Sequence, residues 1–182
     1  MDRGCRVIVT DMDEARLAKA RERGVAAAVN MGEPDAMARL ATLTNGGADI
    51  VVESSGSTPG VLAAYQLARK KPQAYGTEYK VEPIAFYHGD WPRVVLQANY
   101  IENISVNPFS LTPGEGVILI SPRDRGVEDR QKAVEAIRAG RLRAADFIDA
   151  VLPYSKAKDG YAGLQNHRYS SVTYRWGKGD GK

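Results

Sequence analysis

The sequence has few of the residues that most often build metal centres and covalent frameworks. Its 182 residues include one cysteine, Cys5, and two histidines, His88 and His167. A single cysteine excludes an internal disulfide framework and a cysteine-rich zinc site. Serine or cysteine hydrolysis has little support, since no G-x-S-x-G motif is present. We therefore assign no catalytic residue and no metal ligand, although a site built on the two histidines stays open as an alternative.

The chain also lacks long apolar runs and a strong charge imbalance. No apolar stretch is long enough to span a bilayer, and the N-terminus meets acidic residues before any signal-like run. The formal net charge is +3, and no basic block is interleaved with aromatic residues. Hydrophobic residues make up 43% and charged residues 26%, as in ordinary globular proteins. We expect a cytoplasmic protein that binds neither membranes nor nucleic acid.

Strand and helix patterns alternate along most of the chain. Apolar, β-branched runs predict strands at residues 6–10, 25–30, 48–56, 83–89, 116–121, 147–154 and 171–176. Amphipathic or capped stretches predict helices from Asp13 to Gly24 and at residues 33–43, 58–71, 127–140 and 155–166. Three prolines between residues 90 and 116 predict loops with at most short elements. This order predicts an α/β fold with a mainly parallel sheet and flanking helices.

A carboxylate ends the first predicted strand. In dinucleotide-binding folds such an acid accepts hydrogen bonds from the adenosine ribose and disfavours a 2′-phosphate. Acids at strand ends also cap helices, but Asp13 already fills that position. Asp11 is therefore the better candidate for the ribose, and a purely local structural role is the alternative.

The turn after the third predicted strand is the second candidate for ligand binding. Ser55, Gly56 and Ser57 end that strand with small side chains and bare backbone. In parallel sheets the ligand crevice opens at the carboxyl ends of the strands, so this turn could lie against an adenosine. An ordinary strand-to-helix turn favours the same residues, and both interpretations stay open.

Several segments, taken in order, resemble the cofactor domain of the medium-chain dehydrogenase/reductase superfamily, the relatives of zinc-type alcohol dehydrogenases. They are RVIVTDMDEARLAKARERGVAAAVN, NGGADIVVESSG, DRQKAVEAIRAGRL and FIDAVLPYSKAKDGYAGL. The resemblance implies a Rossmann-like fold, NAD as cofactor, and hydride transfer between an alcohol or polyol and its carbonyl. It assigns Asp11 and Arg16 to the adenosine ribose and Ser55 and Gly56 to the adenosine pocket, and we include Ser57 with that turn. Tyr87 and His88 match, more loosely, a strand end near the nicotinamide.

The same resemblance implies parts that this sequence lacks. Phosphate-binding glycines normally precede the ribose acid by about 20 residues, but Asp11 has ten residues before it, and Gly4 is their one glycine. We expect the first strand, its glycine loop and the zinc-bearing catalytic domain to be missing, and the isolated chain to be inactive. Neighbouring strands lie about 4.8 Å apart, so a missing central strand would leave a slot about twice that width. The expected organisation is a partial dinucleotide-binding domain at 1–146, a segment at 147–176 that in relatives returns to the catalytic domain, and a disordered tail at 177–182.

Two other functions remain possible from the sequence. One is a non-catalytic remnant or binding module, which is stable as an oligomer. The resemblance implies a homo-oligomer formed through an edge strand at residues 117–120, and the aromatic-rich end from Tyr154 to Trp176 could add an exposed surface. The other is a SAM-dependent methyltransferase-like domain, which also binds a ribose through an acid. That fold needs a glycine-rich first strand and a final hairpin, and neither pattern is visible here.

Overall fold

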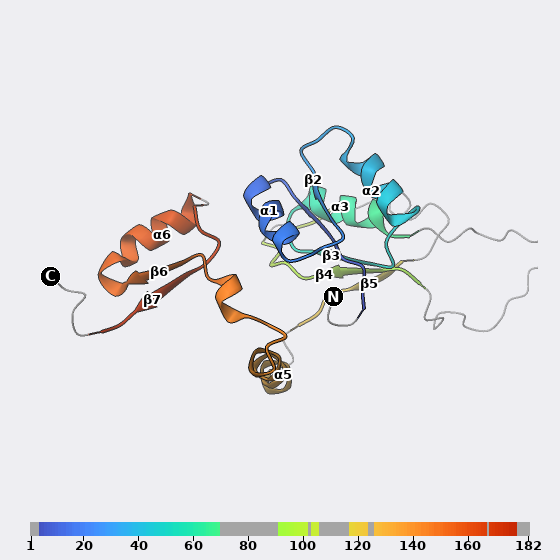
Figure 1. Cartoon of the computed structure of the whole chain (residues 1–182). Helices are drawn as coiled ribbons and strands as arrows, with labels where there is room; N and C mark the ends of the chain where they lie inside the picture. The colour runs from blue at the N-terminus through green and yellow to red at the C-terminus, as the bar shows by residue number, and fades with distance from the viewer. Residues whose placement is uncertain are drawn as a thin grey trace, which may run out of the picture. The chain divides into compact units, whose positions relative to one another are not determined.

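The computed structural model describes residues 4–69, 91–101, 103–105, 117–123, 126–166 and 168–177. The chain divides into two compact units, Met1–Arg123 and Asp124–Lys182, and each is described by itself (Figure 1). The functional boundary after residue 146 stays a prediction. Within the described residues, no helix is long and apolar enough to cross a membrane.

The first unit opens with the strand and helix that the sequence singled out, β1 (Ile8–Asp11) and α1 (Glu14–Glu22). The Asp13 carboxylate caps α1, as predicted. It accepts hydrogen bonds from the backbone N–H groups of Ala15 at 2.8 Å and Arg16 at 3.3 Å. This cap fixes where the chain leaves β1, and therefore fixes the position of the Asp11 side chain.

Strand β2 (Ala27–Asn30) lies parallel to β1, with Asp11 paired to Asn30 at the carboxyl end, and helix α2 (Ala36–Thr44) follows it. The helices hold these strands through apolar contacts. Leu17 of α1 is fully buried, which stabilises the packing by roughly 2 kcal/mol. Leu40 of α2 is 2% exposed and packs on Val29 in a cluster that also includes Ala36. The two carboxyl ends are thus carried by a small but packed scaffold.

The second group of strands forms a parallel sheet in the order β3-β4-β5. Its elements are β3 (Ile50–Glu53), α3 (Thr58–Leu67), β4 (Arg93–Leu96) and β5 (Ile118–Ile120). Helix α3 covers one face of the sheet through a core cluster of Ala64, Ala68 and Val94. Strand β5 ends the sheet, and this agrees with the edge position expected for it.

Strand β4 is one of the short elements that the proline-containing segment allowed, and it is the central strand of its sheet. Pro92 comes immediately before the strand, where a missing backbone N–H is tolerated, so it begins the strand rather than excluding it. The strand predicted at residues 83–89 lies outside the described residues.

The strands do not form one continuous sheet. Strand β1 pairs with β2, and β3 pairs with β4, and among the described residues no strand joins β1 to β3. In the described part of the chain, β1 and β2 therefore form one parallel pair, and β3, β4 and β5 form a second parallel sheet.

The second unit contains helix α5 (Val127–Arg138) and a small parallel sheet of β6 (Ala150–Pro153) and β7 (Val172–Arg175), with helix α6 (Ala157–Gln165) beside it. These elements match the predicted ones within a few residues. Gly160 and Gly163 let α6 lie close to the sheet, because a Cβ atom there would come within 3 Å of the Tyr174 and Tyr169 rings. The tail from residue 178 lies outside the described residues.

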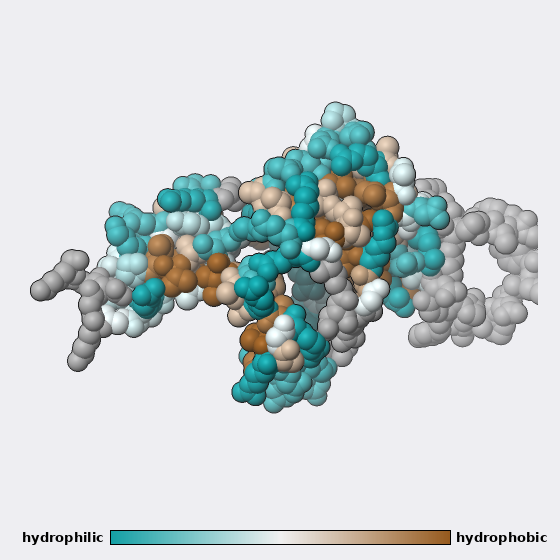
Figure 2. Space-filling model, viewed as in Figure 1, coloured by the Kyte–Doolittle hydropathy of each residue, from teal (hydrophilic) through white to brown (hydrophobic). Residues whose placement is uncertain are grey.

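Apolar surface in this unit is more exposed than a packed core would leave it. Helix α5 has no buried residue, and Val127, Val134 and Ile137, which the pattern offers for burial, are 66%, 44% and 42% exposed. Trp176 is 77% exposed and stacks on Tyr154 with ring centroids 5.0 Å apart. Figure 2 shows hydrophobic patches over α5 and over the unit around α6. The exposure of Tyr154, Tyr161 and Trp176 is what the aromatic-rich end of the sequence offered as a surface, and whether it binds a partner stays a prediction.

Candidate functional site

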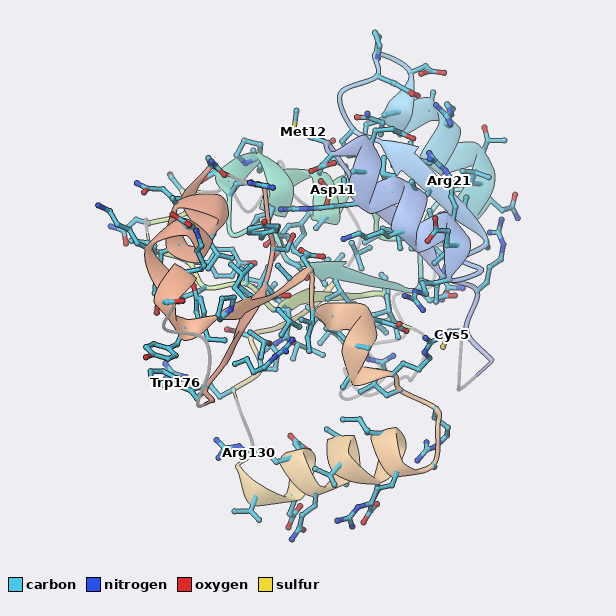
Figure 3. All side chains as sticks on the ribbon, turned by 60° about the vertical axis from the view of Figure 1, so that its left-hand side comes forward. Cys5, Asp11, Met12, Arg21, Arg130 and Trp176 are labelled. Atoms are coloured by element: carbon cyan, nitrogen blue, oxygen red, sulfur yellow. The ribbon has the colours of Figure 1, made fainter. Side chains whose placement is uncertain are left out.

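Asp11 lies at the carboxyl end of β1, immediately before the capped start of α1 (Figure 3). One carboxylate oxygen, Oδ1, accepts a hydrogen bond of 2.9 Å from the backbone N–H of Asp13. The other, Oδ2, lies 3.6 Å from the Arg16 guanidinium, and the Asp11 side chain is 29% exposed. Asp11 therefore has a structural bond on one side and an accessible, charge-paired oxygen on the other.

This geometry modifies the argument made from the sequence. Asp13 does cap the helix, but Asp11 also supports the turn, so it is not free of a local role. Arg16 is shared, because its guanidinium lies 3.8 Å from Asp13 as well as 3.6 Å from Asp11. The structure brings Asp11 and Arg16 together as expected. An accepting oxygen beside a donating guanidinium is a set of partners suited to a vicinal diol such as a ribose.

The second candidate feature is the turn from Glu53 to Ser57 at the carboxyl end of β3. Ser57 caps helix α3 by accepting from the Gly60 N–H at 3.1 Å, and its hydroxyl lies 2.8 Å from that of Ser55. The Ser55 and Ser57 hydroxyls therefore bond to the turn itself.

Two glycines make this turn possible. Gly56 has φ +72°, and a Cβ atom there would lie 2.9 Å from the Asn99 carbonyl oxygen in the loop after β4. A Cβ atom at Gly60 would lie 2.2 Å from the Ser55 hydroxyl and 2.6 Å from the Glu53 carboxylate. The turn is therefore close-packed against its surroundings.

Glu53 organises the turn, and sequence reasoning assigned it no role. It is the buried charged residue of the described chain, at 5% exposed. Its carboxylate accepts from the backbone N–H of Ser55 at 2.7 Å and of Gly56 at 3.3 Å, and from the hydroxyls of Ser55 and Tyr100. Nothing in the sequence indicated Tyr100, which is 47 residues away.

The hydrogen bonds hold Glu53 in its charged form. Burial by itself raises the pKa of the carboxyl, but the bonds from Ser55, Tyr100 and Gly56 outweigh it and keep the pKa below the ordinary 4.5. Burial, and then the bond to Glu53 and its negative charge, raise the pKa of the Tyr100 hydroxyl to about 12. At neutral pH Glu53 is therefore a carboxylate and Tyr100 is a hydrogen-bond donor.

Asp11 lies at the carboxyl end of β1, and the Glu53–Ser57 turn lies at the carboxyl end of β3, and these strands belong to two separate parallel sheets among the described residues. In open α/β sheets, ligands bind outside the carboxyl ends of strands. Tyr87 and His88 lie outside the described residues.

The described residues do not fit a zinc site. They contain no group of three or more His, Cys, Asp and Glu side chains that could hold a metal ion. The residues of the Asp11 pair and the β3 turn do suit the hydroxyl-rich and aromatic surface of an adenosine.

The comparisons agree with the architecture. Residues 2–74 match the model of the family described as zinc-binding dehydrogenase. These residues have the zinc-type dehydrogenase pattern. The match includes β1, β2, β3, Asp11 and the turn, and it confirms the resemblance found in the sequence. One relative of this dehydrogenase segment is a sorbitol dehydrogenase from Halalkalibacterium halodurans, 41% identical over 73 residues, which are 38% of this chain and 21% of that protein.

Solved dehydrogenases share the fold over nearly the whole chain. An NAD-dependent alcohol dehydrogenase has a TM-score of 0.70 at 20% identity and covers 96% of this chain and 45% of its own. A short chain alcohol dehydrogenase from E. coli CFT073, complexed with NADH, has a TM-score of 0.70 at 16% identity, covering 93% and 44%. These likenesses establish a Rossmann-like α/β fold, and nothing in the comparisons supports a methyltransferase. The chain spans less than half the length of these relatives.

Proposed function

We propose that this zinc-type dehydrogenase segment is the NAD-binding part of an alcohol or polyol dehydrogenase. The observation that carries the proposal is the Asp11–Arg16 pair at the end of β1, in the same compact unit as the Glu53–Ser57 turn at the end of β3. The relatives' names support NAD and an alcohol or polyol substrate. A cytoplasmic location is part of the same proposal.

The chain's own residues would orient the cofactor. Asp11 Oδ2 accepts hydrogen bonds from the ribose hydroxyls, and Arg16 donates to the same sugar. The turn at Ser55, Gly56 and Ser57 would pack its small surface against the adenosine. When bound, NAD supplies the hydride-transfer chemistry, while the protein supplies orientation and electrostatics.

Cofactor preference tests this proposal. NADH should bind the full chain more tightly than NADPH, because the Asp11 carboxylate repels a 2′-phosphate that Arg16 alone does not neutralise. Replacing Asp11 by alanine should weaken NADH binding about tenfold and reduce the preference. Fluorescence titration of both cofactors measures this, with Glu14→Ala as a control that removes a carboxylate of α1 outside the pair. Tighter binding of NADPH than of NADH, or an Asp11→Ala variant with unchanged cofactor affinities, would contradict the assignment of Asp11 to the ribose.

A second candidate function is a non-catalytic binding module that assembles with itself. The observation that favours it is strand β5, which ends its sheet with Leu119 50% exposed. A free, apolar edge strand is a template for pairing with another copy. This assembly is compatible with cofactor binding and does not require it.

Assembly can be measured directly. Sedimentation of the full chain at micromolar concentration should show a dimer or a larger species. Leu119→Lys should shift it toward monomer, because a charged side chain on an edge strand opposes pairing. We choose Leu119 for the substitution because Val117 packs against the Ala64–Val94 cluster. A substitution at Val117 would therefore change the stability of the fold as well as the assembly. A clean wild-type monomer, or an assembly that Leu119→Lys leaves unchanged, contradicts the edge-strand dimer.

A further inference from the structure

The carboxyl ends of β3 and β4 are tied together by one side-chain contact. The two strands are in register, with Glu53 opposite Leu96, and the backbone N–H of Gln97 donates to the Glu53 carbonyl at 2.9 Å. Beyond this point the ladder ends and the chains separate into two loops. The Tyr100 hydroxyl then donates to the Glu53 carboxylate and links the loops again.

The two loops also touch through their backbones. The Gly56 position approaches the Asn99 carbonyl so closely that a Cβ atom would lie 2.9 Å from it, and 3.4 Å from the Ala98 Cβ. Glu53 holds the Gly56 N–H on one side, and Asn99 limits the turn on the other. The position of Gly56 therefore depends on where the loop after β4 lies.

Glu53 is 5% exposed, and its carboxylate accepts hydrogen bonds from Ser55, Gly56 and Tyr100 in the described part of the chain. A buried charge that is fully hydrogen-bonded fixes one arrangement of its partners, because any other arrangement leaves the charge unpaired. Glu53 and Tyr100 therefore restrict the conformations available to the turn.

We propose that Glu53 and Tyr100 form a clasp that positions the adenosine-binding turn and couples it to the loop after β4. This inference rests on the proposed function, in which Ser55, Gly56 and Ser57 line the adenosine pocket. Tyr100 is a positioning residue. It acts through Glu53 and the turn, and it preorganises the surface to which the nucleotide binds. Because the two loops are coupled, a nucleotide that binds to the turn also changes the surroundings of residues 98–100.

The test uses the full chain labelled with ¹⁵N and titrated with ADP-ribose, followed by amide NMR. In the wild type, ADP-ribose should shift the amides of Asp11, Ser55 and Gly56, and through the clasp those of Asn99 and Tyr100. Tyr100→Phe removes one hydroxyl and should weaken ADP-ribose binding about tenfold, the size expected for a bond to a charged group. The Asn99 amide should then stop responding, although the protein stays folded.

The control is Tyr65→Phe, which removes a hydroxyl from helix α3 in the same unit but not from the clasp. It should bind ADP-ribose like the wild type. If Tyr100 is only structural, Tyr100→Phe will change the melting temperature but not the affinity of the folded protein for ADP-ribose or the response of the Asn99 amide. That result would overturn the proposal. If Tyr100→Phe does not fold, the wild-type titration decides, since a silent Asn99 amide overturns the coupling.

The outcomes also separate this inference from the proposed function. If ADP-ribose shifts neither Asp11 nor the turn in the wild type, NAD binding and the clasp proposal both fall. If Asp11 and Gly56 respond but Asn99 is silent and Tyr100→Phe binds equally well, NAD binding stands and the clasp alone is wrong. In the double variant Asp11→Ala, Tyr100→Phe, the two losses should multiply, because the residues act on different parts of the nucleotide.

Discussion

Replacing Gly47 by alanine is expected to lower the free energy of unfolding of the first unit by about 3 kcal/mol or more. Gly47 has φ +144°, and a Cβ atom there would lie 2.3 Å from the Arg69 Cα and 2.7 Å from the Arg69 nitrogen. Backbone atoms cannot rotate away as a flexible side chain can. The alanine must therefore break the bridge in which Ala48 N–H donates to Leu67 and Arg69 N–H donates to Ala48, each at 2.8 Å.

Gly46 provides the matched control. It has φ +91°, but a Cβ atom there would have nothing within 4 Å. Gly46→Ala should therefore lose about 1 to 2 kcal/mol from backbone strain alone. Denaturant unfolding followed by Trp91 fluorescence, in a Trp176→Phe background, isolates the first unit because the sequence has two tryptophans. Equal losses for the two variants would show that the approach to Arg69 is not close in solution.

Much of the fold could be predicted from the sequence because local patterns and packing agree. The Asp13 cap, the buried Leu17 and the β-branched run of β3 each indicate their element within a few residues. Strand β4 was missed because its four residues follow a proline, and its place at the centre of a sheet depends on partners distant in sequence. Helix α5 shows the converse, since its amphipathic pattern is clear but its apolar side chains remain exposed.

The candidate site could be predicted only where its residues are close in sequence. Asp11 and Arg16 are five residues apart, and the turn at Ser55 to Ser57 is continuous; the strand-end position indicated Asp11 and made the turn a candidate, whereas Arg16 came from the family resemblance alone. The Glu53–Tyr100 bond joins residues 47 apart in sequence, and it forms because β3 and β4 pair in register. No local pattern carries that information. A buried acid at a strand end is nevertheless a reason to look for a donor on the neighbouring strand.

Replacing Glu53 by glutamine is expected to destabilise the first unit by about 2 to 3 kcal/mol at neutral pH. The amide nitrogen of glutamine cannot accept the bonds that an oxygen of Glu53 now accepts. One side of the side chain would therefore face an N–H group of Ser55 or Gly56 with a donor of its own. Burial leaves no water to relieve that conflict, because Glu53 is 5% exposed.

The stability lost in Glu53→Gln should depend on pH, and the pKa shifts of Glu53 and Tyr100 determine how. The folded state lowers the pKa of Glu53 below 4.5, so its contribution is present above that value and is lost as the pH falls through the lowered pKa. The folded state raises the pKa of Tyr100 to about 12, so the contribution of its hydroxyl is complete below the ordinary 10 and is lost as the pH rises through 12.

The stability difference between wild type and Glu53→Gln should therefore be constant between about pH 5 and 9 and shrink on both sides of that range. Denaturant unfolding followed by Trp91, in the Trp176→Phe background, measures the acid side, and tyrosinate absorbance in wild type and Tyr100→Phe identifies the alkaline step. Using the difference between the two proteins cancels the other titrating groups, which both share. A difference that stays the same from neutral pH down to pH 3 would mean that folding does not shift the pKa of Glu53, and a difference that grows as the pH falls would mean that folding raises it; either result would contradict the hydrogen-bonded carboxylate assigned to Glu53.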